Sequence, residues 1–511
     1  MSPYCQGEGD NRVTLHIEII RERQSFGSLQ NLRVASPLLG ASLMPVVLIE
    51  DTNWTEVHVT DYPVSQIHSV LESILTVPTE NGEEHAPFFQ PGYPYFMRGL
   101  TPFVVQELFR FGIHTEWHVR PRQVNNYSPL PVEFGRPLQN WVVDEMLKHR
   151  YGVIDIATRF GKSFVYLQWY FRAGRPRTII FVPTADIAGQ MRDDFKSVTD
   201  EPIGMVASTV QKEPDWQNLT ICIENSLFDG KTGGYLKPEF LPYLAACEAR
   251  IRDECHKAAT MQANAYMAMP NCIYSWGSSA TPLVGNSYKD MGLIGWHGPK
   301  RVEITAACAA SYGIIAPVNA VWLPFYHEGE IVSEDYSEKY KASVVANFPR
   351  NQMIAWIARE LTEKGKQGLI FVNYSEQGQR IANDIPGSMV VASTLITQKE
   401  ADDIKRWFNA GDIKVVCCTK KWREGVTFKC DFAINAEAMQ ADHVTVQKLG
   451  RGLIPKADGR PFLWVDIDDF GVKMLRRWAD KRRDCLSDEG WAQTTFMDPR
   501  AFQQALRNGE L

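Results

Sequence analysis

The sequence lacks a run of about 18 uncharged, apolar residues, which is the length that a membrane-spanning helix needs. It has no repeat of fixed period and no low-complexity tract, so solenoid, collagenous and disordered architectures are excluded. Its first ten residues contain no basic stretch that leads into an apolar run, so we expect no secretory signal. The composition, 44% hydrophobic and 22% charged over 511 residues, is typical of a globular protein with several cores.

An excess of positive charge is absent too. The chain carries 54 Lys and Arg against 60 Asp and Glu, a net charge of -6, which argues against a polycation that coats nucleic acid. A local basic groove stays compatible with that total. None of the 10 cysteines forms a C-x-x-C pair, so we expect reduced thiols in a cytoplasmic protein and no zinc site.

The organisation of the chain changes after a proline-rich connector at Arg120 to Phe134. Beyond it, short apolar strands such as Tyr151–Ile156 and Thr178–Val182 alternate with amphipathic helices such as Ala185–Ser197. This alternation predicts parallel sheets covered on both faces, and roughly 360 residues of it is too much for one sheet. We predict an α/β protein with an N-terminal extension of unassigned role (1–45), a small α+β accessory domain (46–130), two α/β domains in tandem (131–315 and 316–490) and a C-terminal tail (491–511).

A phosphate-binding loop is predicted between Ile156 and Ser163, where an expected strand leads into an expected helix. Backbone N–H groups at such a helix N-terminus hold phosphates. Lys162 would reach the β- and γ-phosphates of a nucleotide, and the Ser163 hydroxyl would bind Mg²⁺. Two positions depart from the strict pattern: Ile156 stands at the first glycine position, and Arg159 lies inside the loop. The alternative therefore stays open that this is an ordinary helix N-terminus whose lysine binds no phosphate.

An acidic pair lies at Asp253 and Glu254. Asp253 would hold Mg²⁺ through water, and Glu254 would orient and deprotonate the attacking water. The alternative is an exposed charged turn. The strand expected before the pair is imperfect because Arg250 and Arg252 interrupt it, whereas a buried parallel strand is usually continuously apolar.

The order of the motifs along the chain indicates nucleotide hydrolysis more specifically than either motif does alone. Ser279-Ala-Thr281 follows the acidic pair, and Gln447-Lys-Leu-Gly-Arg451 lies far downstream in the second α/β domain. A Q-x-x-G-R segment there could supply an arginine to the γ-phosphate.

This set resembles the superfamily two helicases, most closely the UvsW-type phage DNA helicases related to the XPB-like branch. The resemblance runs from about Val46 to the C-terminal region. It implies two RecA-like domains behind an accessory domain that engages nucleic acid, with ATP and Mg²⁺ as cofactors.

The resemblance also assigns roles to single residues. The residues that would contact the nucleotide are Arg136 and Gln139 of a Q motif, Thr158, Gly161 and Gly425. Those that would act in hydrolysis, with Lys162 and Glu254, are Gln447 and Arg451. The residues that would couple the nucleotide site to the bound nucleic-acid strand are His256, Ser279 and Thr281. Those that would lie along the nucleic acid are Pro183, Thr184, Thr419 and Thr427.

Some positions depart from the family pattern. Ile454 replaces the last arginine of the Q-x-x-G-R-x-x-R motif, with Lys456 two residues on, so slow hydrolysis is an expectation. Ile223 occupies the position where the family has a threonine that contacts the nucleic-acid backbone. Arg252 precedes the acidic pair where an apolar residue is more usual.

A basic stretch at Lys473 to Asp484 offers a second nucleic-acid surface, with Arg476 and Arg477 as the expected phosphate contacts. The alternative is a solvated helix whose charges pair within the helix.

The function expected from these patterns is an ATP-dependent DNA helicase or translocase. By resemblance it would act on branched DNA in replication, recombination or repair, in the host bacterial cytoplasm if the protein is phage-encoded, without a membrane partner. Two alternatives stay open: an RNA helicase or remodelling ATPase, because these motifs grip phosphates, and a DNA-binding protein with a decayed motor.

Overall fold

The computed structural model describes residues 45–79, 82, 84–120, 135–208, 213–229, 235–257, 267, 272–283, 285, 287–328, 335–419, 428–439, 448–450, 452–456 and 458–511. The chain divides into two compact units, residues 1–155 with 162–303 and residues 156–161 with 304–511. Within the described ranges, no helix combines the length and the apolar character needed to cross a bilayer.

The N-terminal part of the first unit is a four-stranded sheet with the strand order β5-β2-β1-β6. Alternate residues of β1 are buried, as expected for a sheet with one covered face, and the core on that face includes Leu48, Leu71 and Val104. This is the predicted small α+β region. Its elements are β1 (Val46–Glu50), β2 (Trp54–His58), α1 (Val64–Ile74), β3 (Thr76–Pro78), β4 (His85–Pro87), β5 (Tyr95–Met97), α2 (Thr101–Arg110) and β6 (Thr115–Val119).

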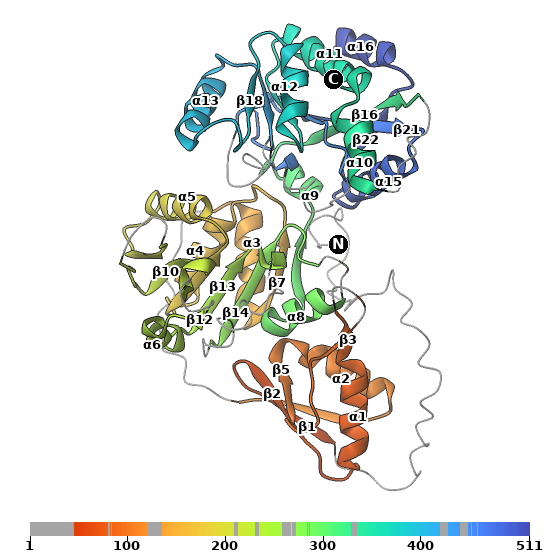
Figure 1. The fold of residues 1–511 in the computed structure, drawn as a ribbon. Helices are drawn as coiled ribbons and strands as arrows, with labels where there is room; N and C mark the ends of the chain where they lie inside the picture. Colours follow the sequence, from red (N-terminus) through yellow and green to blue (C-terminus); the bar gives the residue numbers. More distant parts are fainter. Residues whose placement is uncertain are drawn as a thin grey trace, which may run out of the picture. The chain divides into compact units, whose positions relative to one another are not determined.

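The first large sheet has seven strands in the order β15-β7-β14-β13-β8-β10-β9, and its neighbouring strands pair in parallel from β7 to β9. Strands β8 and β10 are buried along their whole length because helices cover both faces of such a sheet. The elements, orange to green in Figure 1, are α3 (Pro137–Lys148), β7 (Tyr151–Ile156), α4 (Lys162–Arg172), β8 (Thr178–Val182), α5 (Ala185–Lys196), β9 (Ile203–Val206), β10 (Leu219–Ile223), β11 (Phe228–Asp229), β12 (Tyr235–Leu236), α6 (Leu241–Ala245), β13 (Ala249–Asp253), β14 (Tyr274–Ser279), α8 (Ser287–His297) and β15 (Lys300–Ile304).

The second large sheet also has seven strands, all paired in parallel, in the order β18-β19-β17-β20-β21-β16-β22. Two tandem parallel-sheet domains are therefore confirmed. The elements, green to blue in Figure 1, are α9 (Ala306–Ser311), β16 (Val318–Tyr326), α10 (Tyr336–Tyr340), α11 (Phe348–Glu363), β17 (Gly368–Phe371), α12 (Ser375–Asn383), β18 (Met389–Val391), α13 (Gln398–Ala410), β19 (Val415–Cys418), β20 (Phe432–Asn435), β21 (Phe462–Phe470), α15 (Lys473–Asp488), β22 (Ala492–Thr495) and α16 (Pro499–Asn508).

The C-terminal segment is not a tail. Residues 492–495 form the edge strand β22 beside β16, and the fully buried Phe502 of α16 belongs to the core of the second sheet. Helix α16 places Phe502, Ala505 and Leu506 on one buried side, which is the three- and four-residue spacing of an amphipathic helix.

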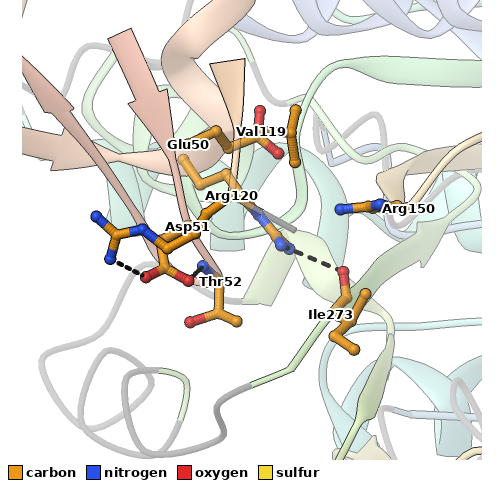
Figure 2. A pocket seen from close by; sticks show the side chains of 8 residues that line it. Glu50, Asp51, Thr52, Val119, Arg120, Arg150 and Ile273 are labelled. Carbon is orange, nitrogen blue, oxygen red and sulfur yellow. Dashed lines mark hydrogen bonds and ion pairs between the residues drawn. The ribbon is translucent and has the colours of Figure 1, made fainter. Parts of the chain in front are cut away.

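The four-stranded N-terminal sheet (β5-β2-β1-β6) shares its hydrophobic core with the first large sheet. The buried Arg98 donates to the carbonyl oxygen of Ile273 at 3.2 Å, and the Tyr151 hydroxyl donates to Glu50 at 2.9 Å. Burial raises the pKa of Glu50 although Arg98 opposes the shift. Figure 2 shows the hollow at this contact, where Arg120 pairs with Asp51 at 3.0 Å.

Candidate functional site

The candidate site lies at the carboxyl ends of three neighbouring strands of the first sheet. The loop 157–161 follows β7, the acidic pair begins at the last residue of β13, and β14 between them ends at Ser279. Carboxyl ends of parallel strands meet at one edge of a sheet, which is where open α/β sheets bind ligands. Segments more than 90 residues apart in sequence therefore converge.

Lys162 is the first residue of α4, and Gly161 before it has a φ of +88°. The Lys162 Nζ lies 3.5 Å from Glu254 Oε1 and 3.8 Å from Asp253 Oδ1. Burial lowers the pKa of Lys162, but the two carboxylates outweigh burial and raise it overall. The residue is therefore a largely buried ammonium ion, with its side chain 12% exposed, that faces two acids.

Asp253 is 7% exposed and accepts a hydrogen bond from the Tyr166 hydroxyl at 2.9 Å. Burial raises its pKa, while Lys162 acts in the opposite direction. Tyr166 was not among the residues predicted for the site. Its signal is helical spacing, because a residue four positions after Lys162 lies on the same face of α4.

Glu254 has a φ of +51°, a left-handed conformation that is strained for a residue with a side chain. The Ser279 hydroxyl donates to Glu254 Oε2 at 3.5 Å and lies 2.7 Å from His256 Nδ1. The backbone N–H of Thr281 donates to the same hydroxyl at 3.1 Å. The predicted coupling residues are thus joined to the acidic pair through one hydroxyl.

Two predicted nucleotide contacts make other contacts in the structure. The Ser163 hydroxyl donates to Asp194 of α5 at 2.7 Å. The Gln139 side-chain oxygen accepts from the Arg136 backbone N–H at 2.8 Å as part of a capping box at the start of α3. Thr158 lies in the loop after β7.

Three of the residues predicted along the nucleic acid are described, and each lies directly after a strand or at the start of the next helix. Pro183 follows β8, and Thr184 is the N-cap of α5, where its hydroxyl accepts from the backbone N–H of Ile187 at 3.4 Å. Thr419 follows β19 in the second sheet and is buried.

The basic stretch predicted as a phosphate surface forms α15, but three of its arginines pair with acids of β21. Arg482 is fully buried and binds Asp466 through two hydrogen bonds of 2.9 and 3.0 Å. Arg476 and Arg483 pair with Asp468. Arg477 is exposed, and half of the six basic residues of this stretch are compensated by acids of β21 within the second unit.

Four predicted site residues, Gly425, Thr427, Gln447 and Arg451, lie outside the described residues. Lys456, which could have replaced the missing arginine, pairs with Asp431 at 2.7 Å. Burial raises the pKa of Asp431, but the Lys456 contact and a backbone hydrogen bond outweigh it and lower it overall.

Comparison with known proteins gives two family matches. The family "type III restriction enzyme, res subunit" matches residues 134–283, and "helicase conserved C-terminal domain" matches residues 352–453. The comparison with curated proteins finds no match.

Three of the solved structures that match this chain are the following. T4 UvsW is 16% identical with a TM-score of 0.41, over 88% of this chain and 99% of that one. The ATP-dependent type ISP restriction-modification enzyme LlaBIII bound to DNA is 12% identical with a TM-score of 0.50, over 74% of this chain and 32% of that one. A variant of S. cerevisiae Dbp5 bound to RNA and ADP BeF3 is 11% identical with a TM-score of 0.48, over 71% of this chain and 90% of that one.

The present chain spans about a third of the restriction-modification enzyme. The res-subunit match covers β7 to β14 of the first parallel sheet, and the helicase match covers β17 to β20 of the second. With both domain models in this order on two RecA-like sheets, the chain is a superfamily two helicase, a nucleic-acid helicase with ATPase activity.

Proposed function

We propose that this helicase hydrolyses ATP at the edge of the first sheet where Lys162 faces Asp253 and Glu254. The observation that carries the proposal is the approach of the Lys162 Nζ to both carboxylates, at 3.5 and 3.8 Å. Lys162 would bind the β- and γ-phosphates, and Glu254 would hold and deprotonate the attacking water. Ser279 and His256 would keep the Glu254 carboxylate in the position that it needs.

The donor set fits a nucleotide with Mg²⁺. A cation stabilises the charged form of a desolvated carboxylate such as Asp253, and the Ser163 hydroxyl offers a second oxygen. In the described parts of the chain, no cluster of three or more His, Cys, Asp or Glu residues could hold a metal by itself. Mg²⁺ that arrives with a nucleotide is held by one or two protein carboxylates together with phosphate oxygens. When bound, the ion would neutralise charge on the phosphates.

The proposed remaining contacts follow the family resemblance. Arg136, Gln139, Thr158, Gly161 and Gly425 would contact the nucleotide, and Gln447 and Arg451 of the second domain would act on the γ-phosphate. Because Lys456 is paired with Asp431, Arg451 would be the one arginine of its motif available for this role. Arg451→Ala should then lower kcat by about 10³-fold or more.

The proposed substrate is branched DNA, with unwinding, branch migration or annealing as the outcome. Support comes from the resemblance of the motif set to UvsW-type helicases. Pro183, Thr184, Thr419 and Thr427 would follow the phosphate backbone, with Arg477 as a peripheral phosphate contact. Roles in recombination and repair, phage origin and action in the host cytoplasm stay predictions on the same resemblance.

Steady-state ATPase assays test the proposal. The wild type is measured alone and with single-stranded DNA, forked DNA and RNA, beside Lys162→Ala and Glu254→Gln. Lys148→Ala, an exposed lysine that pairs with Glu145 on α3, is the matched control. We expect turnover that DNA stimulates more than RNA, forked DNA most of all, and that only the two site variants abolish.

Near-normal turnover in either site variant would refute the site assignment. Stronger stimulation by RNA would select an RNA-remodelling ATPase. Tight ATP binding without turnover under any condition would select a DNA-binding protein with a decayed motor.

A further inference from the structure

Arg252 is a charged residue inside the central part of a parallel sheet. It lies on β13 directly before Asp253, and its side chain is 1% exposed. Its Nε and Nη2 atoms bind the two carboxylate oxygens of Glu224 at 2.7 and 3.1 Å. This two-pronged geometry fixes the direction of the pair as well as its distance.

The pair spans one whole strand of the sheet. In the strand order, β8 lies between β13 and β10. Arg252 is in register with Phe181 of β8, and Phe181 is in register with Cys222 of β10. Glu224 lies two residues beyond Cys222, in the turn Glu224–Leu227, so the guanidinium reaches across β8 to the segment that follows β10.

The two ends of the pair belong to different parts of the proposed motor. On one side, Arg252 is bonded through the main chain to Asp253 and hence to the acidic pair. On the other side, Glu224 follows Ile223, which by the family resemblance stands at a position that contacts the nucleic-acid backbone. The same turn is fixed through Ser226, whose hydroxyl accepts from the Ser208 backbone N–H at 2.9 Å and whose carbonyl accepts from Lys237 Nζ at 2.9 Å.

Stability alone does not explain a charged pair at this place. Burying two charges is unfavourable unless their contact is excellent, and apolar residues of similar volume are often as stable. An apolar side chain is what a buried parallel strand ordinarily carries at such a position. A directional contact that fixes two separate segments relative to each other would account for it.

We propose that Arg252 and Glu224 form a positioning pair that transmits nucleic-acid binding at the end of β10 to the Asp253–Glu254 carboxylates. The inference rests on the proposed function and, in addition, on the family resemblance that puts Ile223, at the end of β10, beside the nucleic-acid strand. Movement of the Glu224 turn on binding would pull on β13 at the residue next to the acidic pair. The pair would therefore govern stimulation of turnover by nucleic acid more than turnover without it.

The test compares Arg252→Met, Glu224→Gln and the double variant with wild type. Basal kcat, KM for ATP, kcat saturated with single-stranded DNA, and DNA affinity are measured for each. Arg250→Met is the matched control, because Arg250 is equally buried on the same face of β13 but binds Ser275 and Asn53 instead. Arg252→Lys keeps the charge without the two-pronged contact.

We expect basal kcat and KM to stay within about twofold, while the ratio of stimulated to basal kcat falls about tenfold, within the usual range of coupling. This ratio should fall no further in the double variant than in either single variant, because each single substitution already removes the same contact. Arg252→Lys should restore part of the stimulation, and Arg250→Met should keep it. If Arg252→Met does not fold, Glu224→Gln carries the test, because it keeps the side-chain shape at a residue that is 18% exposed.

Wild-type stimulation in Arg252→Met or Glu224→Gln would overturn the inference, and so would an equal loss in Arg250→Met. Failure of the proposed function gives a different result. In that case the wild type itself shows no stimulation by any nucleic acid.

Discussion

Arg350→Met removes the guanidinium that holds a buried carboxylate in the second unit. Arg350 Nε and Nη2 bind the Asp469 oxygens at 2.8 and 3.0 Å, and the side chains are 0% and 1% exposed. Burial raises the pKa of Asp469, but Arg350 and His327 outweigh burial, so the pKa lies below its usual value. The variant leaves His327, 2.9 Å away, as the neighbouring group.

The expected loss follows from the proton that the folded variant must bind. A neutral Asp469 costs about 1.4 kcal/mol for each pH unit above an unfolded pKa of about 3.9, or about 4 kcal/mol at pH 7. The Ala436 carbonyl, which loses a 2.7 Å bond from Arg350, still accepts from Gln377 at 3.2 Å. We expect the free energy of unfolding of the second unit to fall by about 3–5 kcal/mol, the usual result of removing one partner of a buried ion pair.

Scanning calorimetry at pH 7 and pH 5 measures this loss. The transition of the second unit should fall by roughly 6 to 20 °C at pH 7, given about 2–4 °C per kcal/mol for a unit of this size. The loss should be smaller at pH 5, because binding a proton costs less there. The control Arg406→Met, in an exposed pair with Asp403, should change stability by less than about 1 kcal/mol. An equally small change in Arg350→Met at pH 7 would refute the reasoning.

Three further predictions concern other parts of the chain. Gly99→Ala should destabilise the first unit by about 1–3 kcal/mol in urea unfolding, because a Cβ there would lie 1.8 Å from a carbonyl oxygen of α8, whereas Gly92→Ala meets nothing within 4 Å. Burial and nearby arginines hold the pKa of His297 well below its usual value. Stability of the first unit should therefore fall by up to about 1.4 kcal/mol per pH unit as the pH drops below about 6.5, where only the unfolded chain gains a proton; an unchanged slope in His297→Gln would contradict this. Arg477→Ala should lower the salt dependence of single-strand binding by about 0.7 in log–log slope, measured by anisotropy, and Arg476→Ala should lower it less because Arg476 is paired.

The sequence was sufficient for the elements whose residues carry a local pattern. Continuous apolar runs such as Thr178–Val182 became buried parallel strands, and the spacing at Ala185–Lys196 became an amphipathic helix. The order of the short motifs indicated the superfamily, because each motif is a local arrangement of a few residues at a strand end. The sequence also placed the loop before Lys162 after one strand and the acidic pair after another, and parallel pairing brings such ends to one edge.

Contacts between distant segments were decided only by the tertiary structure. The charge of Arg250 and Arg252 argued against a buried strand, yet Glu224 and other partners from separate segments satisfy them inside the sheet. The basic run of α15 suggested a phosphate surface until Asp466 and Asp468 of β21 compensated three of its arginines.

The C-terminal segment was assigned as a tail because edge pairing of β22 with β16 leaves no mark in a short sequence. In each of these cases the charged side chain or the edge strand is formed by neighbouring residues. The side chain or strand that pairs with it lies far away along the chain. Sequence patterns report what a residue is, whereas burial and pairing depend on which segments the folded sheets bring together.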